Sequence, residues 1–316
     1  MNERQLGRAA ASLLLLSLAT TACHDPAAPV GVDPRTGVVR PVLFAGGDGG
    51  TAAIYAVRPD GTDLRQLATG DGVVSYPAWS PDGTRIAFVS RRVTQSRIWL
   101  MDADGGHAAP LDDRFPACPT EFRTITWAPA GDRLAAECYT DTWIFDLRAG
   151  SSYGLLELLH PNGLPVQWVW HPAWSPDGSR ISFDSPFDEA SFVAGPRGEQ
   201  VAQLATPAQQ SSWSPDGRRI AFVGGSRPQA GVPIFVADAN GASRRQVTSP
   251  GSLDTEVSPR WSPDGEWLAF QRIVLSCTGT PRQCQGPAQA VFVIRVDGSG
   301  LRQLTPFTLG ASPPSW

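Results

Sequence analysis

Lysine is absent from the 316-residue chain, and all 26 basic residues are arginines, which we attribute to genome composition rather than to chemistry. The formal net charge is −4, and the arginine pairs are scattered along the chain instead of forming the basic stripe of a nucleic-acid binder. We therefore expect no nucleic-acid partner. Only 18% of residues are charged, whereas Gly (32) and Pro (29) are plentiful, which excludes a disordered or coiled-coil chain. This composition indicates short strands and tight turns.

The N-terminal apolar run, residues 9–19, is too short to cross a membrane. Arg4 and Arg8 precede it, as in an export signal. The Ala22-Cys23 pair that follows resembles the end of a bacterial lipoprotein signal, although Thr20 stands where that class usually has leucine. The resemblance implies a signal peptide over residues 1–22 and a lipid on Cys23; cleavage of an ordinary signal peptide nearby is the alternative. Residues 23–40 then predict a flexible tether.

Cysteine is scarce, and its spacing excludes a recognisable zinc motif. An exported chain can form disulfides, and after Cys23 an even number of cysteines remains. Cys277 and Cys284 lie close in one loop, and Cys118 and Cys138 flank one hairpin, so we expect both pairs to be bonded. The four histidines show no metal-ligand spacing either. We therefore expect no metal and no cofactor.

An internal repeat is the strongest pattern in the sequence. The motif Trp-Ser-Pro-Asp-Gly followed by a short apolar run occurs within residues 77–90, 172–183, 212–223 and 260–270, with a degraded copy at 126–135. The marker tryptophans are 39 to 55 residues apart, close to the length of a four-stranded propeller blade. They are Trp79, Trp127, Trp174, Trp213, Trp261 and Trp316.

The repeat also predicts how the chain ends meet. Ser-Pro-Asp-Gly carries preferred residues of a type I turn, and the apolar run after it suits a buried strand. The chain opens on a second strand at residues 41–45 and stops on a first strand at 313–316. We therefore expect these two segments to pair, which closes an all-β propeller of six blades over residues 41–316.

The Trp-Ser-Pro-Asp-Gly repeat resembles that of the TolB-like six-bladed β-propeller family. The resemblance implies an exported, envelope-located propeller of fixed fold and variable function. Only the signal and tether precede the propeller here, whereas TolB has an α/β domain at that point, so we expect a relative of TolB rather than TolB itself. Prolyl-oligopeptidase-like peptidases share the repeat, but the sequence lacks their Gly-x-Ser-x-Gly nucleophile elbow.

Acidic residues in the repeat are expected to be structural. The aspartates of the turns, Asp82, Asp177, Asp216 and Asp264, are of a type that bonds nearby backbone. A second acidic group, Asp184, Asp188 and Glu189, is predicted to form a solvated loop, which could also hold an ion or an arginine.

Loop length suggests where a partner binds. The turns between first and second strands are uniform, whereas the connections on the opposite face, which we call the long-loop face, are long and irregular, and variable loops tend to carry function. That face is predicted to present aromatic, histidine and arginine side chains that could anchor a partner. The alternative is that the rings cap the blade core. The candidates are Tyr76, Phe122, Arg123, Trp168, Trp170, His171 and Arg260.

We therefore expect a non-catalytic, monomeric, lipid-anchored propeller on the periplasmic or extracellular side of the bacterial envelope, binding a protein or peptide through its long-loop face. Two alternatives stay open. One is a hydrolase or lyase acting on glycans at the channel mouth, which needs acids or histidines converging there. The other is a carbohydrate-binding or sensing module, which needs an apolar patch with a polar rim.

Overall fold

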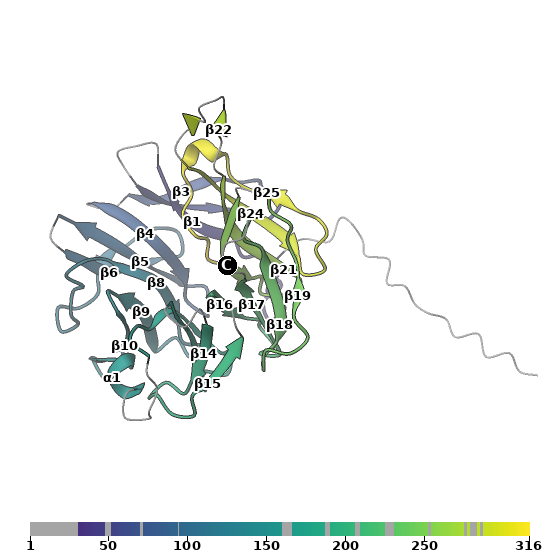
Figure 1. The fold of residues 1–316 in the computed structure, drawn as a ribbon. Coiled ribbons are helices and arrows are strands. Elements are labelled where there is room, and N and C mark those ends of the chain that lie inside the picture. The colour runs from purple at the N-terminus through teal and green to yellow at the C-terminus, as the bar shows by residue number, and fades with distance from the viewer. Residues whose placement is uncertain are drawn as a thin grey trace, which may run out of the picture.

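Six antiparallel β-sheets surround a central axis and form a six-bladed β-propeller (Figure 1). Within each sheet the strands that follow one another in the chain are neighbours, as the repeat predicts. The structure is a computed structural model that describes residues 31–316 except for 48–51, 70–71, 94, 160–165, 187–189, 206–208, 225–230, 252–253, 275–276, 279–282 and 285–286.

The first three blades contain eleven strands. They are β1 (Val42–Gly46), β2 (Ala53–Val57) and β3 (Arg65–Thr69) in blade 1; β4 (Val73–Trp79), β5 (Arg85–Arg92), β6 (Gln95–Asp102) and β7 (Ala109–Pro110) in blade 2; and β8 (Phe122–Trp127), β9 (Arg133–Cys138), β10 (Asp141–Asp146) and β11 (Ser151–Gly154) in blade 3.

The last three blades have four strands each, and blade 6 also carries a two-stranded hairpin in its longest connection. They are β12 (Trp170–Trp174), β13 (Ile181–Ser185), β14 (Ala190–Ala194) and β15 (Ala202–Ala205) in blade 4; β16 (Gln209–Trp213), β17 (Arg219–Val223), β18 (Ile234–Asp238) and β19 (Arg245–Gln246) in blade 5; and β20 (Thr255–Trp261), β21 (Trp267–Val274), β24 (Ala288–Arg295) and β25 (Arg302–Gln303) in blade 6, with the hairpin β22 (Cys277–Thr278) and β23 (Gln283–Cys284).

Helix is nearly absent from the described residues: they contain the short α1 (Leu155–Leu159) and the 3-10 turn η2 (Phe307–Leu309). In that part of the chain, no helix has the length and apolar character needed to cross a membrane.

The C-terminal residues complete blade 1. The amide of Leu43 donates to the carbonyl of Ser315 (2.8 Å), and the amide of Ser315 donates back (2.9 Å). The amide of Ser312 also donates to the carbonyl of Ala45 (2.7 Å). The predicted closure of the ring by residues 313–316 is therefore confirmed, and β1 has a partner on both sides.

Each Ser-Pro-Asp-Gly turn is held by its own side chains. In the first copy the Ser80 hydroxyl bonds Asp82 Oδ1 (2.6 Å), and the amide of Thr84 donates to the same oxygen (3.0 Å). These hydrogen bonds, above all the one from Ser80, lower the pKa of Asp82 to about 2. Asp177, Asp216 and Asp264 make the equivalent contacts. The structural role predicted for these aspartates is confirmed.

The marker tryptophans join neighbouring blades. The indole Nε1 of Trp127 donates to the carbonyl of Ala78, and that of Trp261 to the carbonyl of Ser212, both at 3.1 Å. The arginine at the start of the second strand stacks on the tryptophan of the next blade, a cation–π contact with 4.7–5.3 Å between guanidinium carbon and ring centroid. The pairs are Arg85–Trp127, Arg133–Trp174, Arg180–Trp213 and Arg219–Trp261. The repeat therefore encodes the seams between blades as well as the turns.

Residues 31–40 were expected to belong to the flexible tether, but they form a small hairpin packed on the propeller. An isolated bridge joins Val32 to Val39, and the Asp33 side chain is almost fully buried. Arg40 contributes its backbone as well, because its carbonyl accepts the indole N–H of Trp316 (2.9 Å). Burial and internal hydrogen bonds hold this part of the segment in place; residues 23–30 lie outside the described residues.

Candidate functional site

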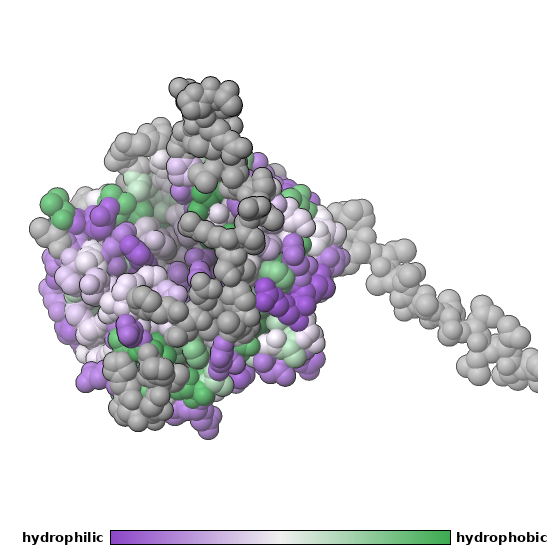
Figure 2. Space-filling view, viewed as in Figure 1, coloured by the Kyte–Doolittle hydropathy of each residue, from purple (hydrophilic) through white to green (hydrophobic). Residues whose placement is uncertain are grey.

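Large exposed hydrophobic side chains do not form one patch in the described part of the chain. They are spread over several blades, and Figure 2 shows hydrophilic residues interspersed with hydrophobic ones on the face in view. A large continuous apolar area would mark a binding surface, and these scattered side chains do not provide one. The scattered residues are Val38, Leu64, Val73, Val93, Tyr139 and Leu301.

A β-bulge recurs in the first strand of five blades, three residues before the marker tryptophan. The strand register shifts there in β4, β8, β12, β16 and β20. The residue at the bulge has a φ of 46° to 54° although it is never glycine, a strained conformation that is commonest near functional sites. These residues are Tyr76, Thr124, His171, Gln210 and Ser258.

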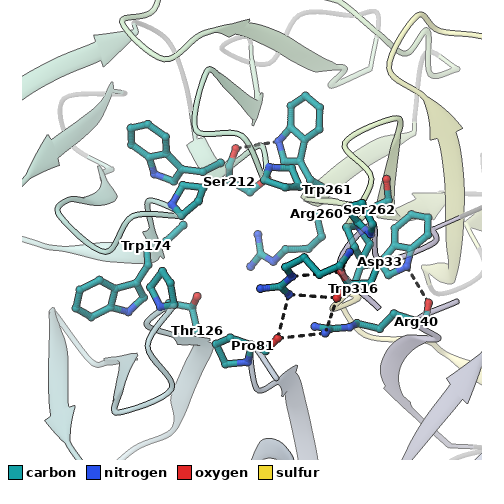
Figure 3. Close-up of a pocket in the computed structure, with 18 of the residues that line it drawn as sticks. Asp33, Arg40, Pro81, Thr126, Trp174, Ser212, Arg260, Trp261, Ser262 and Trp316 are labelled. Carbon is teal, nitrogen blue, oxygen red and sulfur yellow. Dashed lines mark hydrogen bonds and ion pairs between the residues drawn. The ribbon is translucent and has the colours of Figure 1, made fainter. Parts of the chain in front are cut away.

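A funnel of about 530 Å³ opens among the Ser-Pro-Asp-Gly turns, at the centre of the ring (Figure 3). Its wall combines the prolines of the turns with the marker tryptophans and the residues just before them. The volume falls within the range of sites that enclose a small ligand. The lining residues central to the site are Thr126, Ala173, Pro176, Ser212, Pro215 and Arg260.

Arg260 is the long cationic side chain supplied to the funnel by a first strand, β20. It reaches into the ring of residues drawn in Figure 3, and its Nη1 donates to the carbonyl of Pro259 (3.1 Å). Burial lowers its pKa to about 10, so the guanidinium is still charged at neutral pH. The funnel therefore contains a partly buried positive charge.

The hairpin of residues 31–40 forms part of the rim. Asp33 Oδ2 pairs with Nη2 of Arg35 (3.1 Å) and of Arg40 (3.3 Å). Both guanidinium groups also donate to the carbonyl of Pro81, at 3.3 and 3.2 Å. The Asp33 carboxylate therefore organises two arginines beside the funnel, and the Arg35 side chain stays 71% exposed.

A second polar group lies deeper in the ring, two residues before Ala173 on β12. Nδ1 of His171 lies 2.9 Å from Oδ2 of Asp184, and the backbone amide of His171 donates to Oε2 of Glu137 (3.2 Å). Asp184 also accepts from the hydroxyl of Ser191 (2.8 Å) and from the amide of Gln210. Glu137 and Asp184 thus each bind the backbone at a bulge of the next blade.

The environment of these groups shifts their protonation. Burial raises the pKa of Glu137, which is 2% exposed. Burial alone would lower the pKa of His171, but the hydrogen bond and charge of Asp184, with the charge of Glu137, outweigh it and raise that pKa. A histidine oriented by a carboxylate can exchange protons near neutral pH. Among the described residues, no group of three or more His, Cys, Asp or Glu is arranged to hold a metal ion.

The predicted site residues do not gather at one place. Arg260 lines the funnel, on the face of the turns rather than on the long-loop face. His171 and Tyr76 are half-buried at the bulges, and Arg123 is exposed on β8. Phe122 is 2% exposed and packs edge to face on Phe145 with ring centroids 5.7 Å apart, so its expected exposure to a partner is wrong.

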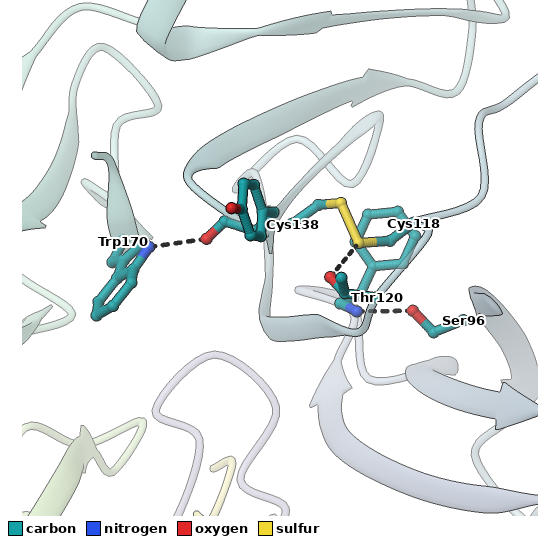
Figure 4. Close-up of a disulfide and its surroundings, with 7 residues drawn as sticks. Ser96, Cys118, Thr120, Cys138 and Trp170 are labelled. Carbon is teal, nitrogen blue, oxygen red and sulfur yellow. Dashed lines mark hydrogen bonds between the residues drawn. A yellow bond between two sulfur atoms is a disulfide. The ribbon is translucent and has the colours of Figure 1, made fainter. Parts of the chain in front are cut away.

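Trp168 and Trp170 lie at the other end of β12 from the turns. Their ring centroids are 4.8 Å apart, and Nε1 of Trp170 donates to the carbonyl of Tyr139 (3.0 Å; Figure 4). Both rings are half-buried, so they can contact a partner only in part. The adjoining connection, residues 160–165, lies outside the described residues, and several other long connections are described only in part.

One predicted disulfide is confirmed: Cys118 is bonded to Cys138, at the end of β9, just before Tyr139 (Figure 4). It ties the connection before β8 to the second strand of the same blade. For the other pair, the backbone of Cys277 lies opposite that of Cys284 between β22 and β23, a spacing compatible with a disulfide. Their side chains are outside the described part of the chain, so this bond stays a prediction.

The sequence did not predict that three acidic residues, Asp33, Glu137 and Asp184, are buried. Asp184 was expected in a solvated loop, but it is 2% exposed within β13; Asp188 and Glu189 lie outside the described residues. Glu137 and Asp184 occupy the repeat position where Val89 and Val223 stand in other blades, so alignment of the repeats could have revealed them. Asp33 had no such signal, because a Pro- and Gly-rich segment predicts a tether.

Comparison with known proteins supports the fold more strongly than a function. No family model matches the chain. It is 25% identical over 223 residues to an uncharacterized peptidase, YuxL, of Bacillus subtilis, covering 66% of this chain and 31% of that protein. It is 39% identical over 80 residues to a TolB homolog of Chlorobium luteolum, covering 24% of this chain and 18% of that protein. The matches thus span about a third or less of these curated relatives.

Solved structures give a wider match. TolB from Acinetobacter baumannii aligns with 87% of this chain and 66% of its own, with a TM-score of 0.66 and 16% identity. A putative TolB from Agrobacterium tumefaciens aligns with 84% of this chain and 88% of its own, with a TM-score of 0.61 and 16% identity. With six blades, the repeated Trp-Ser-Pro-Asp-Gly turn and these alignments together, the chain has the fold of a TolB-like six-bladed β-propeller.

Proposed function

We propose that this chain is a non-catalytic propeller of the bacterial cell envelope that binds a protein or peptide partner in its central funnel. The similarity to TolB proteins supports the class. The observation that carries the proposal is the funnel itself, about 530 Å³ in volume, walled by the prolines of the turns and containing Arg260. A rigid ring of backbone holds this wall in place, so binding costs little conformational entropy on the propeller side.

The proposal moves the binding surface from the long-loop face to the face of the turns. The turns themselves repeat from blade to blade, but the residues just inside them differ: Thr126, Ala173, Ser212 and Arg260 line the funnel. These differences give a repetitive face the means to discriminate between partners. Lipidation of Cys23, which would place the propeller on a membrane surface, belongs to the same proposal.

Site-specific photo-crosslinking in living cells tests whether a partner binds in the funnel. Pro215 and Pro176 are at the rim, and replacing either with p-benzoylphenylalanine should crosslink the same partner. Arg65, exposed on the outer strand β3, and Tyr139, 69% exposed, are matched control positions. Crosslinks to that partner from Tyr139 but from neither proline would return the site to the long-loop face.

A second candidate function rests on the His171–Asp184 pair. A carboxylate that orients a histidine is the arrangement used in general acid–base catalysis, so a glycan-active enzyme with its site in the channel is the competing proposal. Incubation with acidic oligosaccharides should release fragments with the wild-type chain and none with His171→Ala. The binding proposal expects no fragments from either protein.

A further inference from the structure

One position on the wall of the funnel differs from its equivalents in every other blade. The residue just before the marker tryptophan is small or short in five first strands: Ala78, Thr126, Ala173, Ser212 and Ser315. In blade 6 it is Arg260. Small residues keep the centre of the ring open, and the single long side chain places a guanidinium in that space (Figure 3).

Among the described residues, no carboxylate forms an ion pair with this guanidinium, although the negative charge of Asp184 acts on it from farther away. Three arginines and one aspartate line the funnel, and Asp33 is already paired with Arg35 and Arg40. The ion pairs of the described residues lie elsewhere, and the guanidinium of Arg260 donates a hydrogen bond to the carbonyl of Pro259.

Asp184, whose charge acts on Arg260, and the carboxylates of the turns are all engaged in hydrogen bonds of their own. Both oxygens of Asp184 accept hydrogen bonds, from His171, Ser191 and Gln210. The turn carboxylates, such as Asp177 and Asp216, accept hydrogen bonds within their own turns. A partly buried cation without a paired anion favours an anionic ligand, because the ligand recovers the lost solvation.

The rest of the wall favours a peptide over a sugar. Carbohydrates bind on exposed aromatic faces, but three of the four tryptophans that line the funnel are 6–7% exposed, and only Trp316 is half-buried. The surface that remains is made of proline rings and short side chains, which suit aliphatic side chains and an extended backbone.

We propose that Arg260 binds the carboxylate of an acidic peptide segment, either an Asp or Glu side chain or a C-terminal carboxylate, that enters the funnel from the face of the turns. This inference rests on the proposed function and specifies the chemistry of its ligand. Guanidinium and carboxylate form charge-assisted hydrogen bonds that can be bidentate, so a lysine at this position would bind less specifically.

Selection from a random heptapeptide library, displayed with free C-termini, tests the inference on the full chain. Peptides enriched on the wild type should share an acidic position or an acidic C-terminus, and those enriched on Arg260→Glu should carry Lys or Arg there instead. The best wild-type peptide is then measured by fluorescence anisotropy beside its Asn, Gln or C-terminal amide counterpart. We expect the neutral counterpart to bind at least about tenfold more weakly, because charged hydrogen bonds are the stronger class.

Variants separate the local contact from general electrostatics. Arg260→Ala should lose at least about tenfold in affinity, and Arg260→Lys should recover part of it. Arg58→Ala removes one exposed positive charge outside the funnel and should leave binding unchanged. Circular dichroism melting checks that each variant is folded.

Each outcome decides between the two proposals. If enriched peptides lack an acidic position but compete with crosslinking from Pro215, the funnel binds peptides and the role of Arg260 is wrong. If no peptide is enriched, both the peptide inference and its acidic chemistry are overturned. Tighter binding of an oligogalacturonate probe than of any peptide, lost in Arg260→Ala, would assign the site to acidic glycans instead.

Discussion

Nδ1 of His171 lies 2.9 Å from Oδ2 of Asp184, and the two residues come from neighbouring strands of blade 4. Because Asp184 and Glu137 outweigh the effect of burial, the pKa of His171 is raised above 6.5. A raised histidine pKa stabilises the fold at low pH, and this contribution is lost as pH rises through the folded-state pKa.

Replacing the carboxylate of Asp184 should therefore lower the pKa of His171 again. Asp184→Asn keeps an oxygen acceptor but removes the negative charge, so the pKa of His171 should fall. Titration of the His171 imidazole by NMR measures it directly. The remaining charges facing the ring are Glu137 and Arg260. A His171 pKa that is the same in both proteins would show that Asp184 does not control this histidine.

Asp141, at the start of β10, should destabilise the fold at neutral pH. Burial raises its pKa from 3.8 to about 6, although Oδ1 accepts the amides of Thr142 (2.7 Å) and Leu156 (2.8 Å). The native state then binds the proton more tightly than the unfolded state, so stability falls as pH rises between these two values.

Asp141→Asn keeps an acceptor without the charge and should stabilise the protein at pH 7 by about 1–3 kcal/mol. The gain should disappear below about pH 4. Urea unfolding at both pH values checks this. Asp177→Asn is the control, and its effect on stability should have the opposite sign. Hydrogen bonds lower the pKa of Asp177 to about 2, so removing its charge should destabilise the protein at neutral pH. Equal effects of Asp141→Asn at both pH values would show that burial does not raise the pKa of Asp141.

The Cys118–Cys138 disulfide closes a loop with a sequence separation of 20. In the chain-entropy model, a cross-link of this length contributes about 3 kcal/mol to stability. The Cys118→Ala, Cys138→Ala double variant should lose stability of this order in denaturant titrations. The Cys277→Ala, Cys284→Ala variant gives the same comparison for the second pair. Mass spectrometry that finds free thiols at both positions in unreduced peptides would disprove that bond.

The paired ends of the chain should control thermal stability. Deleting residues 313–316 removes the backbone bonds between Leu43 and Ser315 and the contact of Trp316 with Arg40. We expect a sharp drop in Tm, which differential scanning calorimetry can measure. Trp316→Phe keeps the backbone bonds and loses only the indole N–H, so its effect should be small. A truncated protein that melts like the wild type would mean that closure contributes little.

Cys23 lies outside the described residues, and its lipidation can be tested in cells. The wild-type chain should sediment with membranes, whereas Cys23→Ser should appear in the soluble fraction. Ala22→Ser, which keeps a small residue before the cysteine, should behave like the wild type. A wild-type protein already found in the soluble fraction would show that the chain is not anchored in this way.

The fold could be predicted because the residues that form the turn and the contacts between blades recur in each repeat. Ser80 and Asp82 define a turn, Trp127 fixes the seam to the previous blade, and Arg85 stacks on that tryptophan. All three contacts follow from residues that repeat at a fixed spacing, so even the degraded copy at Trp127 was recognisable.

The candidate site could be predicted only in part. Arg260 was identified, but loop variability assigned it to the long-loop face, whereas it lines the funnel among the turns. The funnel depends on small residues such as Ser212 and Ala173, which have no functional signature until the ring places them around one axis. The buried state of Asp184 depends on Gln210 from the next blade, and such a contact between blades is not visible in a strand pattern.

The seam in blade 1 also has a kinetic consequence. Its contacts join Ala45 and Ser312, which are 267 positions apart, whereas the other blades pair strands that follow one another in the chain. Contacts between distant residues slow folding, so this seam should be the last part of the ring to form. Until Ser312 arrives, the inner edge of β1 is unpaired, and an unpaired edge can accept a strand from a second molecule. The rate of this single step therefore sets how long a newly synthesised chain is exposed to strand exchange with its neighbours.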